Sequence, residues 1–112
     1  MNYTKKEKKN LRELAALAYE RELVEALEEL YANFSQWKKG EIQAFDLQDY
    51  IHKFHNGISR ELWNVYAAGH NDFAVIQAVA KGVVSEKEVK DVLWIKIKPR
   101  ADILKDNNLV GE

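Results

Sequence analysis

Apolar positions recur at helical spacing through the first third of the chain, and nothing there breaks a helix. No proline or glycine occurs between Thr4 and Gly40. Thr4 and Glu7 have the spacing of a capping box, in which each side chain bonds the backbone amide of the other residue. Gly40 suits the left-handed conformation that commonly follows the end of a helix. The pattern therefore predicts one long helix over about residues 5–38.

The apolar residues of this predicted helix divide into two sets, with a polar stretch at residues 19–22 between them. The weaker set is Leu11, Leu14, Ala15 and Ala18. The stronger set is Leu23, Val24, Leu27, Leu30, Tyr31, Phe34 and Trp37. The change of phase indicates a gentle kink or a change of packing partner. We therefore expect the N-terminal third of the helix to project from the body of the domain.

Two shorter amphipathic helices are predicted in the middle of the chain. The first begins near residues 43–46 and has its apolar residues at the spacing of one helix face. Asn56-Gly57 is a strong turn signal, and we expect it to end this helix. Ser59 then caps the next helix, of about ten residues, which Gly69 closes.

Two further helices are predicted in the last third. Residues 72–82 are apolar on nearly every side between a capping aspartate and a closing glycine. Ser85 and Glu88 form a second capping box, which predicts a helix to about residue 97 that Pro99 stops. Residues 92–97 are rich in β-branched side chains, so a short strand is the alternative. We favour helix because the cap is strong and no partner strand is visible.

These patterns predict an all-α protein. The expected architecture is an antiparallel bundle of four to five helices, with one long N-terminal helix and short helical hairpins. A chain of 112 residues can close a single core, so residues 1–112 are expected to form one domain. We expect residues 1–4 and 106–112 to be frayed.

Composition and charge narrow the functions. A formal charge of −1 gives no general attraction for nucleic acid or for an anionic membrane. No apolar segment approaches the length of a membrane span or a signal-peptide core. The chain has no cysteine, which excludes disulfides and thiolate metal sites. We expect a cytoplasmic protein that binds neither membrane nor nucleic acid.

One polar cluster has residue types that could carry chemistry. Asp49, His52 and His55 follow each other at helical i, i+3 spacing, at which imidazoles and a carboxylate can share a divalent metal. Arg60 and Glu61 open the next helix close by and could bind a polar ligand or an anion. The apolar residues of the helix that begins near residues 43–46 define its core-facing side, and His52 points to the opposite side. This direction favours histidines on the surface. We therefore expect no cofactor, with a divalent metal as the alternative.

The long helix is the feature most suggestive of function. Its first turns are basic and residues 13–30 are mainly acidic. We expect a non-catalytic interaction or regulatory domain that binds a protein partner or itself, self-associating through the long helix. The alternatives are a metal-dependent or acid–base enzyme using the histidine cluster, and a helical sensor of a small ligand. The aromatic residues proposed for the interface are Tyr31, Phe34, Trp37, Trp63 and Trp94.

Overall fold

The computed structural model describes residues 2–107, and these residues form helices and no strand. The all-α class and the helical state of residues 92–97 are therefore confirmed. The elements are α1 (Lys5–Lys38), α2 (Ala44–Phe54), the π-helical turn η1 (His55–Ser59), α3 (Arg60–Tyr66), α4 (Asn71–Lys81), the 3-10 turn η2 (Glu86–Glu88) and α5 (Asp91–Asp106). Residues 1 and 108–112, which include most of the expected C-terminal fraying, lie outside the described part.

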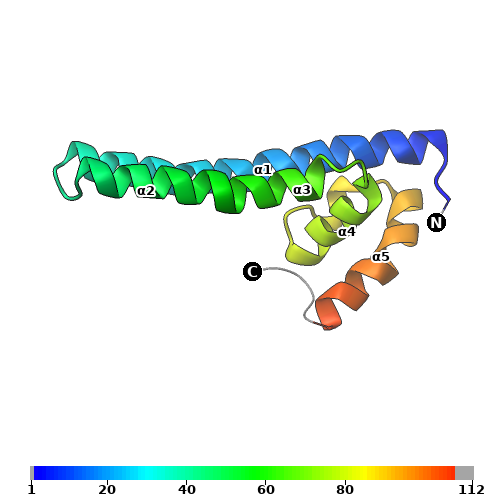
Figure 1. The fold of residues 1–112 in the computed structure, drawn as a ribbon. Coiled ribbons are helices and arrows are strands. Elements are labelled where there is room, and N and C mark those ends of the chain that lie inside the picture. Colours follow the sequence, from blue (N-terminus) through cyan, green and yellow to red (C-terminus); the bar gives the residue numbers. More distant parts are fainter. Residues whose placement is uncertain (1, 108–112) are drawn as a thin grey trace.

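The chain has two structurally different parts (Figure 1). Helix α1 runs along the whole molecule, whose longest dimension is 53 Å. The segment α2–η1–α3 returns beside it and forms a long hairpin. Helices α4 and α5 pack at the end of the hairpin where α1 begins, and they leave the other end uncovered. We call residues 24–54 the arm; its first residues, at Glu25, Ala26 and Glu29, lie near the end of α4, and the rest extends away from it.

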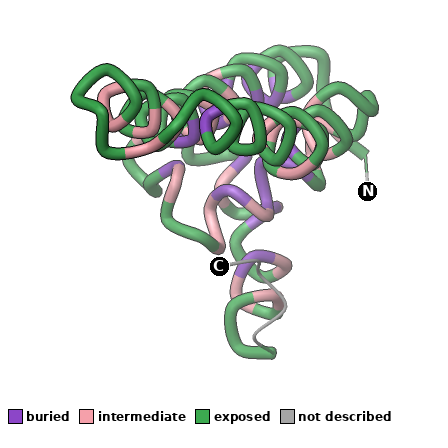
Figure 2. The backbone as a smooth tube through the Cα atoms, turned by 60° about the vertical axis from the view of Figure 1, so that its left-hand side comes forward, coloured by how far each residue is buried: buried purple, intermediate pink, exposed green. Residues whose placement is uncertain are grey.

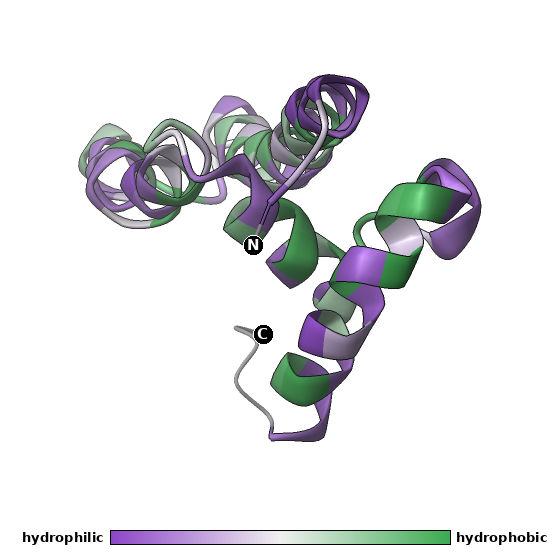
Figure 3. Cartoon of the chain, turned by 90° about the vertical axis from the view of Figure 1, so that its right-hand side faces the viewer, coloured by the Kyte–Doolittle hydropathy of each residue, from purple (hydrophilic) through white to green (hydrophobic). Residues whose placement is uncertain are grey.

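The hydrophobic core lies where α1, α4 and α5 meet. Helix α4 contacts both neighbours, and its hydrophobic residues lie between the hairpin and α5 (Figure 3). The arm, by contrast, is mainly exposed (Figure 2). The buried core residues are Leu11, Leu14, Ala15, Ala18, Val75, Ile76, Ala78, Val84, Val89, Leu93, Ile97 and Ala101.

The expectation that the N-terminal third of α1 projects from the body is wrong. The weaker apolar set, residues 11–18, supplies the α1 side of the core, and the far end of α1 is the part that projects. Small side chains explain the reversal. Ala15 and Ala18 are both buried, and a side chain of one carbon allows neighbouring helices to approach closely.

The turn predicted at Asn56-Gly57 is also wrong, because the backbone stays helical from α2 through η1 into α3. Positive φ occurs at three of the described glycines, but Gly57 is not among them. Leu47 and Phe54 lie seven residues, or about two helical turns, apart on α2, so both lie on the same side of the helix. In a regular helix, seven further residues would bring Glu61 to that side, toward α1. The π turn accommodates one extra residue, so Leu62 is buried in that place instead.

The capping boxes form as predicted. The amide of Thr4 donates to Glu7 Oε1 at 2.7 Å, and the amide of Glu7 donates to Thr4 Oγ1 at 3.1 Å. Thr4 is therefore held in place rather than frayed. The box of Ser85 and Glu88 is present as well, but it organises the 3-10 turn η2, and the last helix begins only at Asp91.

The prediction that Pro99 stops the last helix is wrong, because α5 continues to Asp106. Pro99 removes one backbone hydrogen bond, the one to the carbonyl of Ile95. Ile95 is exposed, so water can satisfy that carbonyl. Beyond the proline, Ala101 is buried and Leu104 packs against the core. Continuing the helix therefore buries apolar surface that a stop at residue 97 would leave in water.

Candidate functional site

The polar cluster predicted on α2 does not come together as a metal site. Asp49 is paired with Lys53, with Oδ2 and Nζ 3.0 Å apart. His52 and His55 are exposed. Within residues 2–107, no three histidine or carboxylate side chains are grouped so that they could hold a metal ion.

The π turn separates the remaining members of that cluster. His55 and Arg60 line an open depression of about 270 Å³, together with Tyr19, Ser59 and Trp63. Glu61, the neighbour of Arg60, lines a different hollow between the hairpin and the end of α4. The arrangement gives two shallow, differently charged surfaces rather than one site with converging groups.

We call the second hollow, of about 510 Å³, the acidic groove. It is lined by Glu22, Glu25, Ala26, Glu29, Ile58, Glu61, Lys81 and Val83. Glu22 is fixed there, because it accepts a hydrogen bond from the Tyr66 hydroxyl and pairs with Lys81 Nζ at 3.3 Å. Burial raises the pKa of the Tyr66 phenol far above its ordinary value of 10.0, and the hydrogen bond to Glu22 raises it further. This contact ties α3 and α4 to α1.

A row of exposed apolar residues lies on the arm. Within α1, Leu23, Ala26 and Leu30 are buried or half-buried, and α1 packs against α2, η1 and α3 of the hairpin. A second row, beginning one residue later, is exposed in the described structure. Its exposed fractions are 42% for Val24, 45% for Leu27, 72% for Tyr31 and 39% for Phe34. We call this row the arm stripe.

The arm stripe has the periodicity of a helix–helix contact. Its residues follow each other at intervals of three, four and three, which places all of them on one side of α1. The alternation of intervals of three and four residues is that of the seam of a coiled coil. Helix α1 of the arm thus carries two seams, one facing α2 and one facing solvent.

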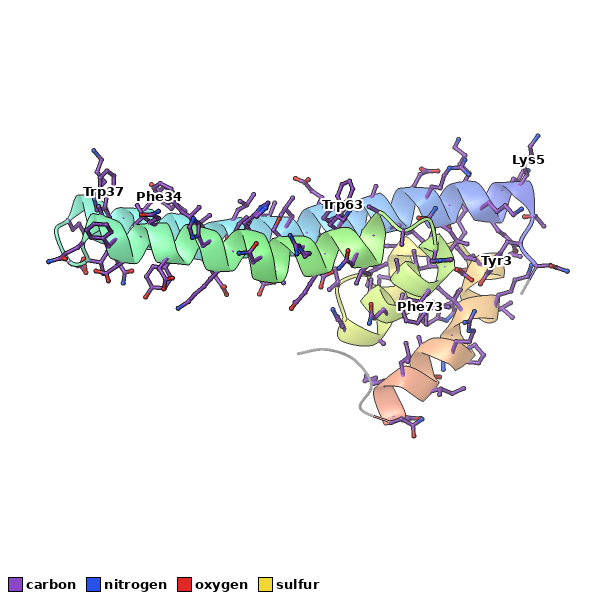
Figure 4. The ribbon with its side chains drawn as sticks, in the orientation of Figure 1. Tyr3, Lys5, Phe34, Trp37, Trp63 and Phe73 are labelled. Carbon is purple, nitrogen blue, oxygen red and sulfur yellow. The ribbon has the colours of Figure 1, made fainter. Side chains whose placement is uncertain are left out.

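The aromatic residues proposed for an interface are divided by the structure. Tyr31 and Phe34 belong to the arm stripe, and Trp37 lies at the tip of the arm with Lys38 Nζ 5.5 Å from its ring centre. Figure 4 shows Phe34 and Trp37 far from α4 and α5, with Trp63 nearer to them on α3. Trp94 is partly buried against the core.

Val24 and Leu27 were not singled out from the sequence as interface residues. The sequence places them in the stronger apolar set of α1, but nothing in that pattern distinguishes the row that faces solvent from the row that faces the rest of the hairpin. Comparison of the chain with protein-family models, curated proteins and solved structures finds no match. The candidate functional surface is therefore identified from geometry, and it is the arm stripe.

None of the described helices has the combination of length and apolar character that crossing a membrane requires.

Proposed function

We propose that this chain is a small, non-catalytic, cytoplasmic interaction domain that self-associates through the arm. The observation that carries the proposal is the exposure of Val24, Leu27, Tyr31 and Phe34 in one continuous row. Apolar residues scattered singly over a surface are ordinary, whereas a contiguous apolar patch commonly marks an interaction site. An arm that extends away from the core is also accessible to a partner.

The thin packing of the arm supports the same proposal. Leu47 is the buried residue of α2, so the contact between α1 and α2 encloses little apolar surface. Two helices packed together share only one seam, and a second seam on α1 needs a further helix. When two arms meet, their four helices can enclose a common interior. The antiparallel helix bundle predicted from the sequence would, in this proposal, be completed by the second copy.

The competing functions have weaker support. An acid–base or metal-dependent enzyme would need Asp49, His52 and His55 to converge, but Asp49 is engaged by Lys53. A sensor of an apolar small molecule would need an enclosed apolar pocket. The acidic groove is instead lined by four glutamates and is open to solvent.

Analytical ultracentrifugation of the purified chain over a wide concentration range tests the proposal. We expect a concentration-dependent dimer, and we expect Leu27→Lys to convert it to a monomer, because an ammonium group would be desolvated in the contact. The helical content of the variant should be unchanged, since Leu27 is already half exposed in the single chain. Circular dichroism checks that point.

Ile95→Lys is the matched control. Ile95 is an aliphatic residue at 73% exposure on α5, outside the arm, so this variant should still dimerise. A wild-type chain that sediments as a monomer at every concentration would disprove self-association. A dimer that Ile95→Lys dissolves and Leu27→Lys leaves intact would place the interface on α5 instead.

A further inference from the structure

We infer that the second copy lies antiparallel along α1, with Val24 of each chain opposite Phe34 of the other and Leu27 opposite Tyr31. The same pairing places Glu20 opposite Lys38 at both ends of the contact. The inference rests on the proposed self-association and specifies its direction and register. The structural features that carry it are the spacing, size and charge of six residues on one side of α1.

The spacing of these residues reads the same from both ends. Glu20, Val24, Leu27, Tyr31, Phe34 and Lys38 are separated by intervals of 4, 3, 4, 3 and 4 residues. A row with this symmetry can meet an identical row running in the opposite direction with every position matched. Antiparallel coiled coils need such a match between alternating intervals of three and four.

Side-chain size favours the antiparallel direction. The two aliphatic residues, Val24 and Leu27, occupy the first half of the arm stripe, and the two aromatic residues occupy the second half. In an antiparallel pair each aromatic ring meets an aliphatic side chain, so large and small residues alternate across the contact. In a parallel pair Phe34 would meet Phe34 and Val24 would meet Val24, with crowding at one end and a gap at the other.

Charge favours the same direction. Glu20 and Lys38 flank the arm stripe and are exposed. Neither forms a side-chain ion pair within the described chain, although Lys38 lies over the Trp37 ring. Antiparallel pairing brings the carboxylate of one chain to the ammonium of the other at both ends, whereas parallel pairing brings like charges together. Such rim charges mainly set orientation rather than affinity.

The core-forming helices leave room for this arrangement. Leu27 follows Ala18 by nine residues, which is half a turn at about 100° per residue. Since Ala18 faces the core, the arm stripe points away from α4 and α5. The overlap of residues 20–38 is about 27 Å long, so the two cores lie at opposite ends of a dimer about 80 Å long.

The chain has no cysteine, so single cysteines can report the direction of pairing. Glu20→Cys and Lys38→Cys chains, one carrying a mass tag, are mixed under mild oxidation and the disulfide-linked products are weighed. We expect the mixed pair to cross-link and each variant alone to remain largely uncoupled. Self-coupling of Glu20→Cys, or no coupling in a mixture that still dimerises, would overturn the antiparallel register.

Charge reversal gives a second measurement without cysteines. Glu20→Lys and Lys38→Glu should each weaken dimerisation roughly tenfold, because each creates two like-charge contacts per dimer. The double variant Glu20→Lys/Lys38→Glu should recover the wild-type dissociation constant. A double variant as weak as the singles would overturn the pairing. A wild-type monomer would overturn self-association itself, whereas a wild-type dimer that fails these tests overturns only the pairing.

Discussion

Arg21 and Glu88 join the middle of α1 to the segment before α5 through two parallel hydrogen bonds. Arg21 Nη1 donates to Glu88 Oε1 at 2.8 Å, and Nη2 donates to Oε2 at 2.6 Å. Nη1 also donates to the carbonyl of Val83 at 2.8 Å, while the amide of Ser85 donates to Glu88 Oε1 at 3.0 Å. A planar guanidinium matches a carboxylate in this way better than an ammonium does.

This pair predicts a pH dependence of stability. The hydrogen bonds from Arg21 and then from the Ser85 amide lower the pKa of Glu88 from 4.5 to about 2. A carboxyl whose pKa falls on folding stabilises the native state above its unfolded pKa. Its contribution to the free energy of unfolding should therefore be complete above pH 4.5 and disappear as the pH falls toward about 2. Urea unfolding of the wild type and Glu88→Gln across that range measures it.

The wild type should be the more stable protein above pH 4.5, and the two curves should converge toward pH 2. Glu28→Gln is a suitable control, because Glu28 is exposed on the same helix as Arg21 and forms no ion pair among the described residues. A difference between wild type and Glu88→Gln that stays constant with pH would contradict the prediction.

A second prediction compares a buried isoleucine with an exposed isoleucine on α5. Ile97 is fully buried and Ile95, two residues earlier, is 73% exposed. Ile97→Ala should lower the free energy of unfolding by about 2–5 kcal/mol, because it leaves a cavity among α1, α4 and α5. Ile95→Ala should change it by less than about 0.5 kcal/mol. Chemical unfolding of both variants provides the test, and equal losses would mean that α5 does not pack as described.

A third prediction concerns the π turn. Deleting Gly57 should convert η1 into regular α-helix and still leave Leu62 against α1, now seven residues after Phe54. Because a glycine inside a helix costs roughly 0.5–1 kcal/mol relative to alanine, this deletion should leave the free energy of unfolding unchanged or raised. Deleting Gln48 is the matched control, because α2 has no bulge there to absorb the change. Equal destabilisation by the two deletions would mean that the extra residue of η1 does not determine which side chains of α3 face α1.

Local chemistry accounts for most of what could be predicted of the fold. Gly40 and Gly82 both have positive φ at the ends of helices, and both capping boxes form, because these features need only residues a few positions apart. Gly57 follows an asparagine and looks the same in sequence, yet it remains helical. The difference lies in α1, whose long surface can pack against α2 and α3 only if the chain continues straight.

The candidate site was also only partly predictable, because local sequence does not determine how the helices pack. Leu23 and Val24 are adjacent and both strongly apolar, but Leu23 is half-buried and Val24 is exposed on the arm stripe. The periodicity of α1 reveals that its apolar residues are too many for one seam. It does not reveal which row faces α2, since that depends on where α2 lies. Likewise, Pro99 opposes a helix locally, yet α5 continues past it, with Ala101 buried and Leu104 packed against the core.

The single long helix α1 also determines the order in which the protein can fold during synthesis. All helices of the hairpin are complete once residue 66 has emerged, whereas the core joins residues 11–18 to residues 75–101. Contacts between distant segments form only after the later one is available. The core-facing side of α1 must therefore stay open to solvent, or to a chaperone, until residues 75–101 are available, whereas the arm needs no residue beyond 54. During translation, the arm can therefore form before the core.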